Sequence, residues 1–210
     1  MRIVVSALSA TISGVALHSA LWRRLDIPDG LAHGSLSELE PDPLHPHGGY
    51  LLDGSAVVHD ERGPWSLRFS VVTDHGWQTR TAFVEVLADD GLERITLTAD
   101  PLGEWTLDDR PWPELRGCVD VDVSASPLTN TLPVQRLGLS VGQEATVDVA
   151  WLDVPSLAVH RVSQTYRRLD DDARGFATYT YADPVYGPFV FGADAAGVVA
   201  DYQGLFARVA

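Results

Sequence analysis

Apolar and polar residues alternate with a period of two along most of this chain. In residues 119–124, for example, three valines alternate with two aspartates and a serine. We also interpret as strands the segments 20–26, 56–58, 65–72, 79–87, 94–98, 104–107, 135–139, 145–152, 158–167, 176–181, 189–193 and 198–200. Turns rich in glycine and proline separate them at a spacing of roughly 8–12 residues. This pattern predicts an all-β fold, a sandwich or an open barrel, and not a series of βαβ units.

One segment near the end of the chain has the period of a helix instead. Between Asp201 and Val209, Tyr202, Leu205, Phe206 and Val209 fall on one apolar stripe. The sequence therefore predicts a single C-terminal helix after the strands.

A faint internal repeat suggests that the sheet consists of two related halves. Residues 98–105 and 192–199 both contain Ala-Asp-x-x-Gly, and the same offset aligns the segment 79–87 with 173–181. Asp-x-x-Gly is also a common turn sequence, so unrelated turns are the alternative explanation.

The N-terminal residues 1–20 differ from the rest, since they form a mildly apolar run without regular alternation. They are diluted by serine and threonine and lack a clean signal-peptidase site. We expect a loose extension or an extra strand, with 21–210 as one domain and 1–18 dispensable for folding. A signal peptide and a start codon annotated too far upstream are the alternatives.

The net charge of −14 restricts the partners. All 15 cationic residues are arginines, and no basic patch is available to neutralise phosphates, so nucleic acid and anionic lipid surfaces are disfavoured. No run is long and apolar enough for stable membrane insertion. The single Cys118 is typical of a reducing compartment, which predicts a cytoplasmic protein, or an exported one if residues 1–20 are a signal. The oligomeric state is left open.

The stretch 117–137 carries the most distinctive polar residues. A strand with Asp120 and Asp122 on one face breaks at Ser126-Pro127, and Thr129, Asn130 and Arg136 follow. Paired carboxylates can perform acid–base chemistry or bind a metal, but they also pair with arginines. We expect ion pairs, with a hydrolase-like enzyme that uses Asp120 and Asp122 as an alternative.

Other kinds of chemistry lack their motifs. The seven histidines show no metal-ligand spacing, and no Gly-x-Ser-x-Gly elbow is present. Cys118 lies between apolar residues, which favours a buried structural thiol over a nucleophile. We therefore predict no catalytic residue, no metal ligand and no cofactor.

The chain resembles the bacterial family of putative glycolipid-binding proteins from about residue 21 to its end. The matching motifs are Trp22-Arg23-Arg24-Leu25-Asp26, Trp77-x-Thr79-Arg80, Gly103-x-Trp105, Gly117-Cys118-Val119-Asp120-Val121-Asp122, Asp194-x-x-Gly197, Tyr202-x-x-Leu205 and, most specifically, the string from Ser126 to Pro133 followed by Arg136-Leu137. The family is similar to periplasmic lipoprotein localisation factors, which implies a curved antiparallel sheet, an incomplete β-barrel, around an apolar groove.

The resemblance and the residue types together predict non-catalytic binding of a hydrophobic or amphiphilic small molecule, for which a glycolipid is a candidate. Aromatic rings can stack on sugars and cover acyl chains, while carboxylates, amides and arginines bind hydroxyls. The candidate ligand-binding residues are Trp22, Arg24, Trp77, Arg80, Trp105, Asp120, Asp122, Thr129, Asn130 and Arg136. A scaffold without a ligand is the remaining alternative.

Overall fold

The structure is a computed structural model that describes residues 16–41 and 46–209. Its strands are β1 (Ala16–Arg24), β2 (Asp29–Leu39), β3 (Gly49–Asp60), β4 (Gly63–Thr73), β5 (Thr79–Ala88), β6 (Gly91–Ala99), β7 (Trp105–Leu107), β8 (Arg110–Pro111), β9 (Asp120–Val123), β10 (Glu144–Asp153), β11 (Ala158–Arg168), β12 (Ala177–Ala182), β13 (Phe189–Ala193), β14 (Val199–Tyr202) and β15 (Phe206–Arg208). The 3₁₀ helices η1 (Pro113–Leu115) and η2 (Pro127–Asn130) and the helix α1 (Thr131–Leu137) complete the fold.

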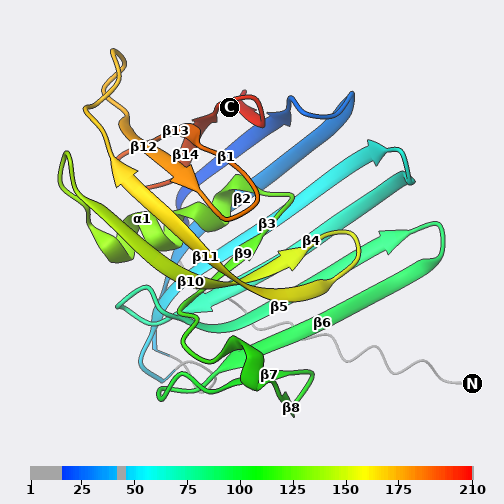
Figure 1. The fold of residues 1–210 in the computed structure, drawn as a ribbon. Helices are drawn as coiled ribbons and strands as arrows, with labels where there is room; N and C mark the ends of the chain where they lie inside the picture. Colours follow the sequence, from blue (N-terminus) through cyan, green and yellow to red (C-terminus); the bar gives the residue numbers. More distant parts are fainter. Residues whose placement is uncertain (1–15, 42–45, 210) are drawn as a thin grey trace, which may run out of the picture.

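The strands form one continuous curved sheet (Figure 1). Strands β1–β8 follow each other as antiparallel neighbours, and so do β10–β15. The two halves are joined where β1 pairs with β15, with Trp22 opposite Arg208. Among the described strands, β9 alone breaks the antiparallel pattern, because it pairs with β10 in parallel. The expected all-β fold is confirmed.

The sheet curves back on itself, but no ladder of hydrogen bonds between the described edge strands closes it into a barrel. The two edge strands are β8 and β9. Near the start of β5, the backbone N–H of Thr79 donates to the Val119 carbonyl at 3.1 Å. The Thr79 hydroxyl accepts from the N–H of Val121 at 3.2 Å. These contacts hold β9 against β5 at one point, so the expected incomplete β-barrel is confirmed.

The predicted C-terminal helix is wrong, because 201–209 contributes to two strands instead. Tyr202 ends β14, the turn uses Gly204 at a φ of 74°, and Phe206 begins β15. Tyr202 pairs with Phe206 across this hairpin, and both side chains are buried. The ladders to β13 and β1 satisfy the backbone groups of this segment, and this tertiary pairing overrides the helical stripe.

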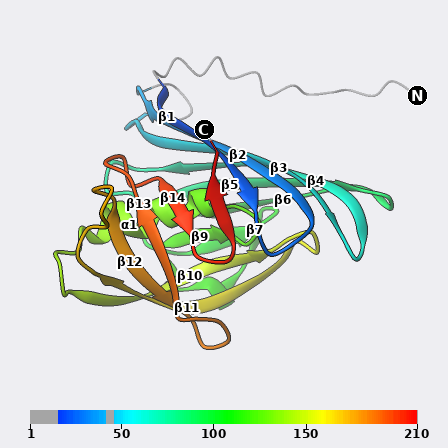
Figure 2. The ribbon, with the colours of Figure 1, turned by 90° about the horizontal axis from the view of Figure 1, so that it is seen from above.

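The actual helix, α1, lies where the segment 135–139 was expected to be a strand. Figure 2 shows α1 between the two halves of the sheet, on its concave side. A segment in this position has no neighbouring strand to pair with, so it satisfies its backbone hydrogen bonds internally as a helix. Gly138 ends α1 in the left-handed conformation, with a φ of 52°. We call η2 together with α1, residues 127–137, the plug.

The plug fills much of the concave side with apolar side chains. Leu128 and Leu132 are fully buried. Gly34 on β2 makes room for the plug, since a Cβ there would lie 2.8 Å from Cδ2 of Leu128 and 3.1 Å from Cζ3 of Trp22. The element that covers the concave face is therefore the plug, which lies at a different place in the chain from the predicted C-terminal helix.

The repeat seen in the sequence corresponds to a recurring turn. In turns that start at Asp74, Asp100, Asp172 and Asp194, the aspartate Oδ1 accepts from the N–H groups two and four residues later. These turns follow β4, β6, β11 and β13, so each half of the sheet contains one hairpin between two such turns. Because aspartate turns form independently of ancestry, duplication of the two halves stays a prediction.

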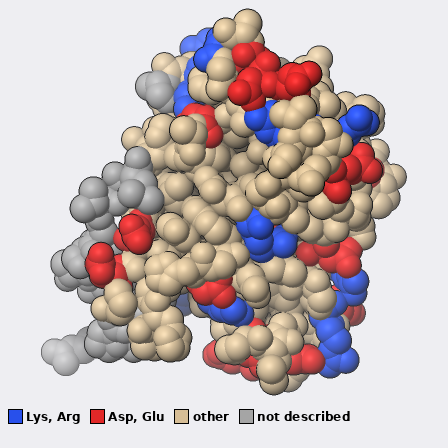
Figure 3. Space-filling model, turned by 90° about the vertical axis from the view of Figure 1, so that its left-hand side faces the viewer, with Lys and Arg blue, Asp and Glu red and all other residues tan. Residues whose placement is uncertain are grey.

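Acidic residues near these turns are largely paired with arginines. Arg80 pairs with Asp74 and Arg168 with Asp171, and Arg174 contacts Asp172 at 3.0 Å. The carboxyl ends of β4, β6 and β11 lie on the left in Figure 1, and arginines and carboxylates lie next to one another in the space-filling view of that side (Figure 3). Arginines on this side therefore offset part of the negative charge.

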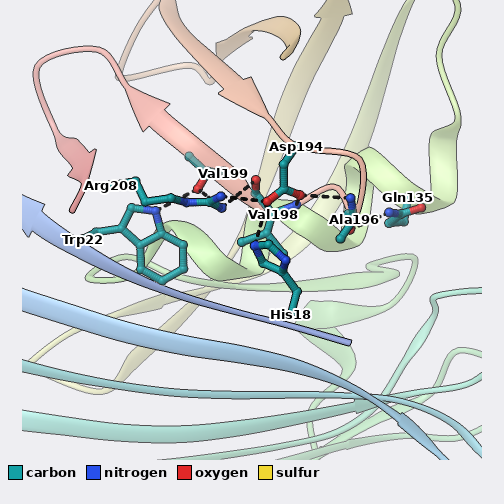
Figure 4. A network of polar contacts seen from close by, with 8 residues as sticks. All are labelled: His18, Trp22, Gln135, Asp194, Ala196, Val198, Val199 and Arg208. Atoms are coloured by element: carbon teal, nitrogen blue, oxygen red, sulfur yellow. Dashed lines mark hydrogen bonds and ion pairs between the residues drawn. The ribbon is translucent and has the colours of Figure 1, made fainter. Parts of the chain in front are cut away.

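Residues 1–15 lie outside the described part of the chain, whereas 16–20 belong to β1 and pair with β2. Nε2 of His18 lies 2.8 Å from Oδ2 of Asp194, and the same oxygen accepts from Nη1 of Arg208 at 2.8 Å (Figure 4). These contacts join β1, the turn after β13 and β15. Dispensability of the N-terminus stays a prediction for residues 1–15, while removal of His18 would delete a contact of the sheet.

Candidate functional site

A cavity of about 520 Å³ lies beside the plug. Its wall combines side chains from the β3–β4 turn, the end of β9, η2, the end of β10, the loop after β12 and the β14–β15 hairpin. The lining residues are Arg24, Ile27, Asp60, Glu61, Arg62, Trp65, Asp122, Val123, Ser124, Ser126, Pro127, Asn130, Trp151, Asp153, Val154, Tyr181, Asp183, Tyr186, Phe189, Tyr202, Leu205 and Phe206. Segments distant in the sequence therefore meet at one site.

Aromatic rings make up a large part of the cavity wall. Phe189 and Tyr202 meet edge to face at 5.9 Å between ring centroids, and Tyr202 meets Phe206 at 6.5 Å. Trp151 on β10 and Trp65 on β4 also line the cavity. Rings of this kind present flat apolar surfaces to a ligand, at little cost in conformational entropy.

The floor of the cavity is polar and centres on Asp122. Its Oδ1 accepts from the Thr129 hydroxyl at 3.0 Å, and its Oδ2 accepts from Nε2 of Gln164 at 2.6 Å. Nε2 of Gln164 also donates to the Tyr181 hydroxyl at 3.0 Å, which in turn donates to Oδ2 of Asp183 at 2.8 Å. A connected network thus runs from β9 through β11 to the loop after β12.

Burial governs the titration of this network. It raises the pKa of Asp122, and although hydrogen bonds from Gln164 and Thr129 oppose this, the nearby Asp183 charge adds to the increase. Burial also raises the pKa values of Tyr181 and Tyr202, with the Asp122 charge as a further cause. The two phenols therefore stay neutral hydrogen-bonding groups at ordinary pH.

Asp120, two residues before Asp122 on the same face of β9, has a different environment. Its carboxylate accepts from Nε and Nη2 of Arg136 at 3.0 and 2.5 Å, and only 1% of its side chain is exposed. The expected ion pair is thus present for Asp120. For Asp122 that expectation is wrong: among the described residues its hydrogen-bond donors are neutral, because β11 places Gln164 there instead of an arginine.

The structure distributes the sequence-predicted ligand residues over three kinds of position. Arg24, Asp122 and Asn130 line the cavity. Thr129 and the Asp120–Arg136 pair are outside its lining and connect the plug to β9. Trp22, Trp105, Trp77 and Arg80 lie away from its lining: the first two are buried, Trp77 stacks on Tyr50 at 3.9 Å between centroids, and Arg80 pairs with Asp74.

Arg80 also lines a second cavity of about 340 Å³ together with Cys118. Cys118 is buried, and burial raises the pKa of its thiol to about 11. A thiol with this pKa is almost entirely protonated at neutral pH, so the interpretation of Cys118 as a structural residue agrees with its surroundings.

Several residues of the cavity lining and of the Asp122 network were not among the sequence candidates. Trp65 and Trp151 carried a signal, because tryptophans at alternating strand positions either pack in the core or line a groove. The sequence contained little indication of Tyr181 on β12, Asp183 in the following loop and Gln164 on β11. Only the order of strands in the sheet brings these segments near β9. These members of the network could not be predicted because they are far from β9 in the sequence, and not because of their residue type.

Two further observations concern possible cofactors and membranes. Within the described ranges, no three histidine, cysteine, aspartate or glutamate side chains gather into a metal-binding group. No helix in that part of the chain has the length and apolar character to cross a membrane.

The chain is similar to proteins whose structures have been solved. It is similar to a crystal structure of a DUF1089 family protein from Pseudomonas aeruginosa, with 32% identity, a TM-score of 0.71, and coverage of 85% of this chain and 92% of that one. A beta-barrel-like protein of the domain of unknown function DUF1849 from Brucella abortus shares the fold, with 13% identity, a TM-score of 0.52, and coverage of 92% and 94%. No curated protein matches the chain. Residues 19–208 match the family model described as putative glycolipid-binding, and the chain therefore belongs to that family.

Proposed function

We propose that the protein binds an amphiphilic small molecule in the cavity beside the plug, without catalysis, and that a glycolipid is a candidate ligand. The observation that carries this proposal is the composition of the cavity: aromatic rings form its wall and the Asp122 network forms its floor. Its volume of about 520 Å³ falls in the range of roughly 300–1,000 Å³ that is typical of ligand sites.

The arrangement of groups suits a ligand with one apolar and one polar part. Trp151, Tyr202 and Phe206 offer surfaces for an acyl chain or a sugar face. Asn130 and Asp122 at the floor offer hydrogen bonds to hydroxyl or amino groups. The family description supports the same class of ligand.

A hydrolase that uses Asp120 and Asp122 is the less favoured function. Asp120 is engaged by both nitrogens of the Arg136 fork, and it does not belong to the cavity lining. A second carboxylate that is bound in this way is poorly placed to activate water or attack a substrate. A scaffold without a ligand is also less favoured, because such a role requires no cavity. The single cysteine, which forms no disulfide within the chain, supports a cytoplasmic location.

Octyl glucoside, used below its micelle concentration, tests the binding proposal by isothermal titration calorimetry. We expect saturable binding with one site per chain. Trp151→Ala should weaken binding by about tenfold, in line with the loss of one aromatic contact to a ligand. Trp77→Ala, which changes a tryptophan outside the lining, is the matched control and should change affinity by less than about twofold. The absence of saturable heat would contradict the proposal.

A further inference from the structure

The proposed function does not define the charge of the ligand. The charged side chains that line the cavity are mostly acidic. Its lining contains five carboxylates and two guanidinium groups: Asp60, Glu61, Asp122, Asp153 and Asp183 against Arg24 and Arg62. The surface around the aspartate turns differs, since its acidic residues are largely paired with arginines. The lining of the cavity thus carries three more carboxylates than guanidinium groups.

The two arginines are placed where they compensate other groups. Arg24 donates to both carboxylate oxygens of Asp26, at 3.1 and 2.5 Å, and its guanidinium packs 5.4 Å from the Phe206 ring centroid. Arg62 is exposed in the β3–β4 turn, and its backbone N–H donates to Asp60 at 2.8 Å. Neither arginine forms an ion pair with Asp122, Asp153 or Asp183 in the described structure.

These three carboxylates accept hydrogen bonds from neutral donors. Asp153 accepts from the Ser156 hydroxyl at 2.7 Å, and Asp183 accepts from the Tyr181 hydroxyl and from the backbone N–H of Val185 at 2.7 Å. Asp122 is partly buried, and in the described structure its donors are Thr129 and Gln164. Partial burial of a carboxylate without a cation is costly, and a positively charged ligand group would reduce that cost.

The aromatic wall strengthens the same preference. A cation within about 6 Å of a ring centroid is attracted by the negative face of the ring, and more strongly in a site with little water. Seven rings line the cavity, from Trp65, Trp151, Tyr181, Tyr186, Phe189, Tyr202 and Phe206. Walls of low polarity also concentrate the field of the carboxylates inside the cavity.

We infer that the polar end of the ligand carries a positive charge, an ammonium group that binds to Asp122 between the aromatic rings. An alkylamine and an amino sugar both present this group. This inference rests on the proposed binding function and narrows it, since it places anionic headgroups such as sulfate, phosphate and carboxylate among the poor ligands.

Four probes measured by calorimetry at pH 7 and low ionic strength, below their micelle concentrations, test the inference. Octylamine, octyl glucoside and octyl sulfate share a tail and differ in charge, and glucosamine supplies an ammonium on a sugar without a tail. Octylamine is protonated at this pH, because an alkylammonium has a pKa of about 10.4. Its affinity should exceed that of octyl glucoside by at least about tenfold, the value of one hydrogen bond to a charged group. Octyl sulfate should bind more weakly than both.

The variant Asp122→Asn keeps the shape of the floor and removes its charge. It should weaken octylamine binding by about tenfold and octyl glucoside binding by a smaller factor, because the neutral amide can still form hydrogen bonds with sugar hydroxyls. Asp109→Asn removes the same charge from an exposed position outside the cavity and should leave both affinities unchanged. If glucosamine binds and Asp122→Asn weakens its binding, the source of the ammonium is an amino sugar. If octylamine binds and glucosamine does not, the source is an alkylamine.

The pH dependence provides a second readout. An ammonium stabilises the ionised form of Asp122, so octylamine affinity should rise as pH rises through the elevated pKa of this carboxyl, and then level off. Asp183 and Asp120 are the acidic neighbours, Arg136 is bound to Asp120, and Tyr166, Tyr181 and Tyr202 stay neutral in this range. Asp122→Asn should abolish this slope.

The possible outcomes distinguish a failure of the ammonium inference from a failure of the proposed binding function. The ammonium inference is overturned if octyl sulfate binds as tightly as octylamine. It is also overturned if the Asp122→Asn variant binds octylamine with normal affinity. In both cases the proposal of amphiphile binding remains in place. If none of the three octyl compounds binds, both proposals fail. Circular dichroism of Asp122→Asn distinguishes a lost contact from a lost fold.

Discussion

Asp120→Ala is expected to lower the free energy of unfolding by about 3–5 kcal/mol, the range for breaking a buried ion pair from one side. The side chain of Asp120 is 1% exposed, and that of its partner Arg136 is 17% exposed. Loss of the carboxylate leaves the guanidinium without its bidentate acceptor in a region of low polarity. The pair also connects α1 to β9, so the position of the plug depends on it.

Urea unfolding followed by circular dichroism measures this effect, and a double-mutant cycle with Arg136→Ala isolates the pair. The double variant should be less destabilised than the sum of the single variants, because no unpaired charge remains. Glu104→Ala is the control, since it breaks the exposed Glu104–Arg116 pair and should barely move the midpoint. A normal midpoint for Asp120→Ala would show that the pair does not fix the plug.

Leu128→Ala in the plug is the second large expected effect, a loss of about 2–5 kcal/mol in the free energy of unfolding. Leu128 is fully buried between the concave face of the sheet and the rest of the plug. Because the surrounding strands form a continuous sheet, they cannot collapse freely into the space left by the removed methyl groups. Leu102→Ala, at a side chain that is 88% exposed, is the control and should change stability by less than about 0.5 kcal/mol.

The contact between Leu128 and Gly34 allows a more specific test. Gly34→Ala alone should destabilise the protein by about 1–3 kcal/mol, because the new Cβ would lie 2.8 Å from Leu128. In the Leu128→Ala background the same methyl group enters vacated space, so the double variant should be more stable than additivity predicts. Strict additivity would contradict the close packing of the plug on β2.

The β-strand content of the protein could be predicted from the sequence, whereas the location of its helix could not. Alternation in segments such as 65–72 and 145–152 follows from one buried sheet face, and this rule is local. The residues of 201–209 fit a helical stripe and also fit two short strands around Gly204. Pairing with β13 and β1 decides between these possibilities, and pairing partners are not visible in a local pattern.

The candidate site shows the same division. The sequence identified Asp120, Asp122, Asn130 and Arg136 as one polar cluster, and they do lie close to the junction of β9 and the plug. It could not tell the two aspartates apart, since they occupy equivalent positions on one strand face. The cation beside Asp120 comes from α1, while Gln164 beside Asp122 comes from β11.

By itself, the sequence determined the alternation of the strands, the aspartate turns and the family motif, because each depends on residues close together in the chain. Only the tertiary structure decided which aspartate is paired, which tryptophans line a cavity and which segment covers the concave face. Those outcomes depend on the order of strands in the sheet, which places β9, β11 and the loop after β12 around one space. The physical reason is that burial and pairing are set by neighbours in space, and here these neighbours come from segments far apart in the chain.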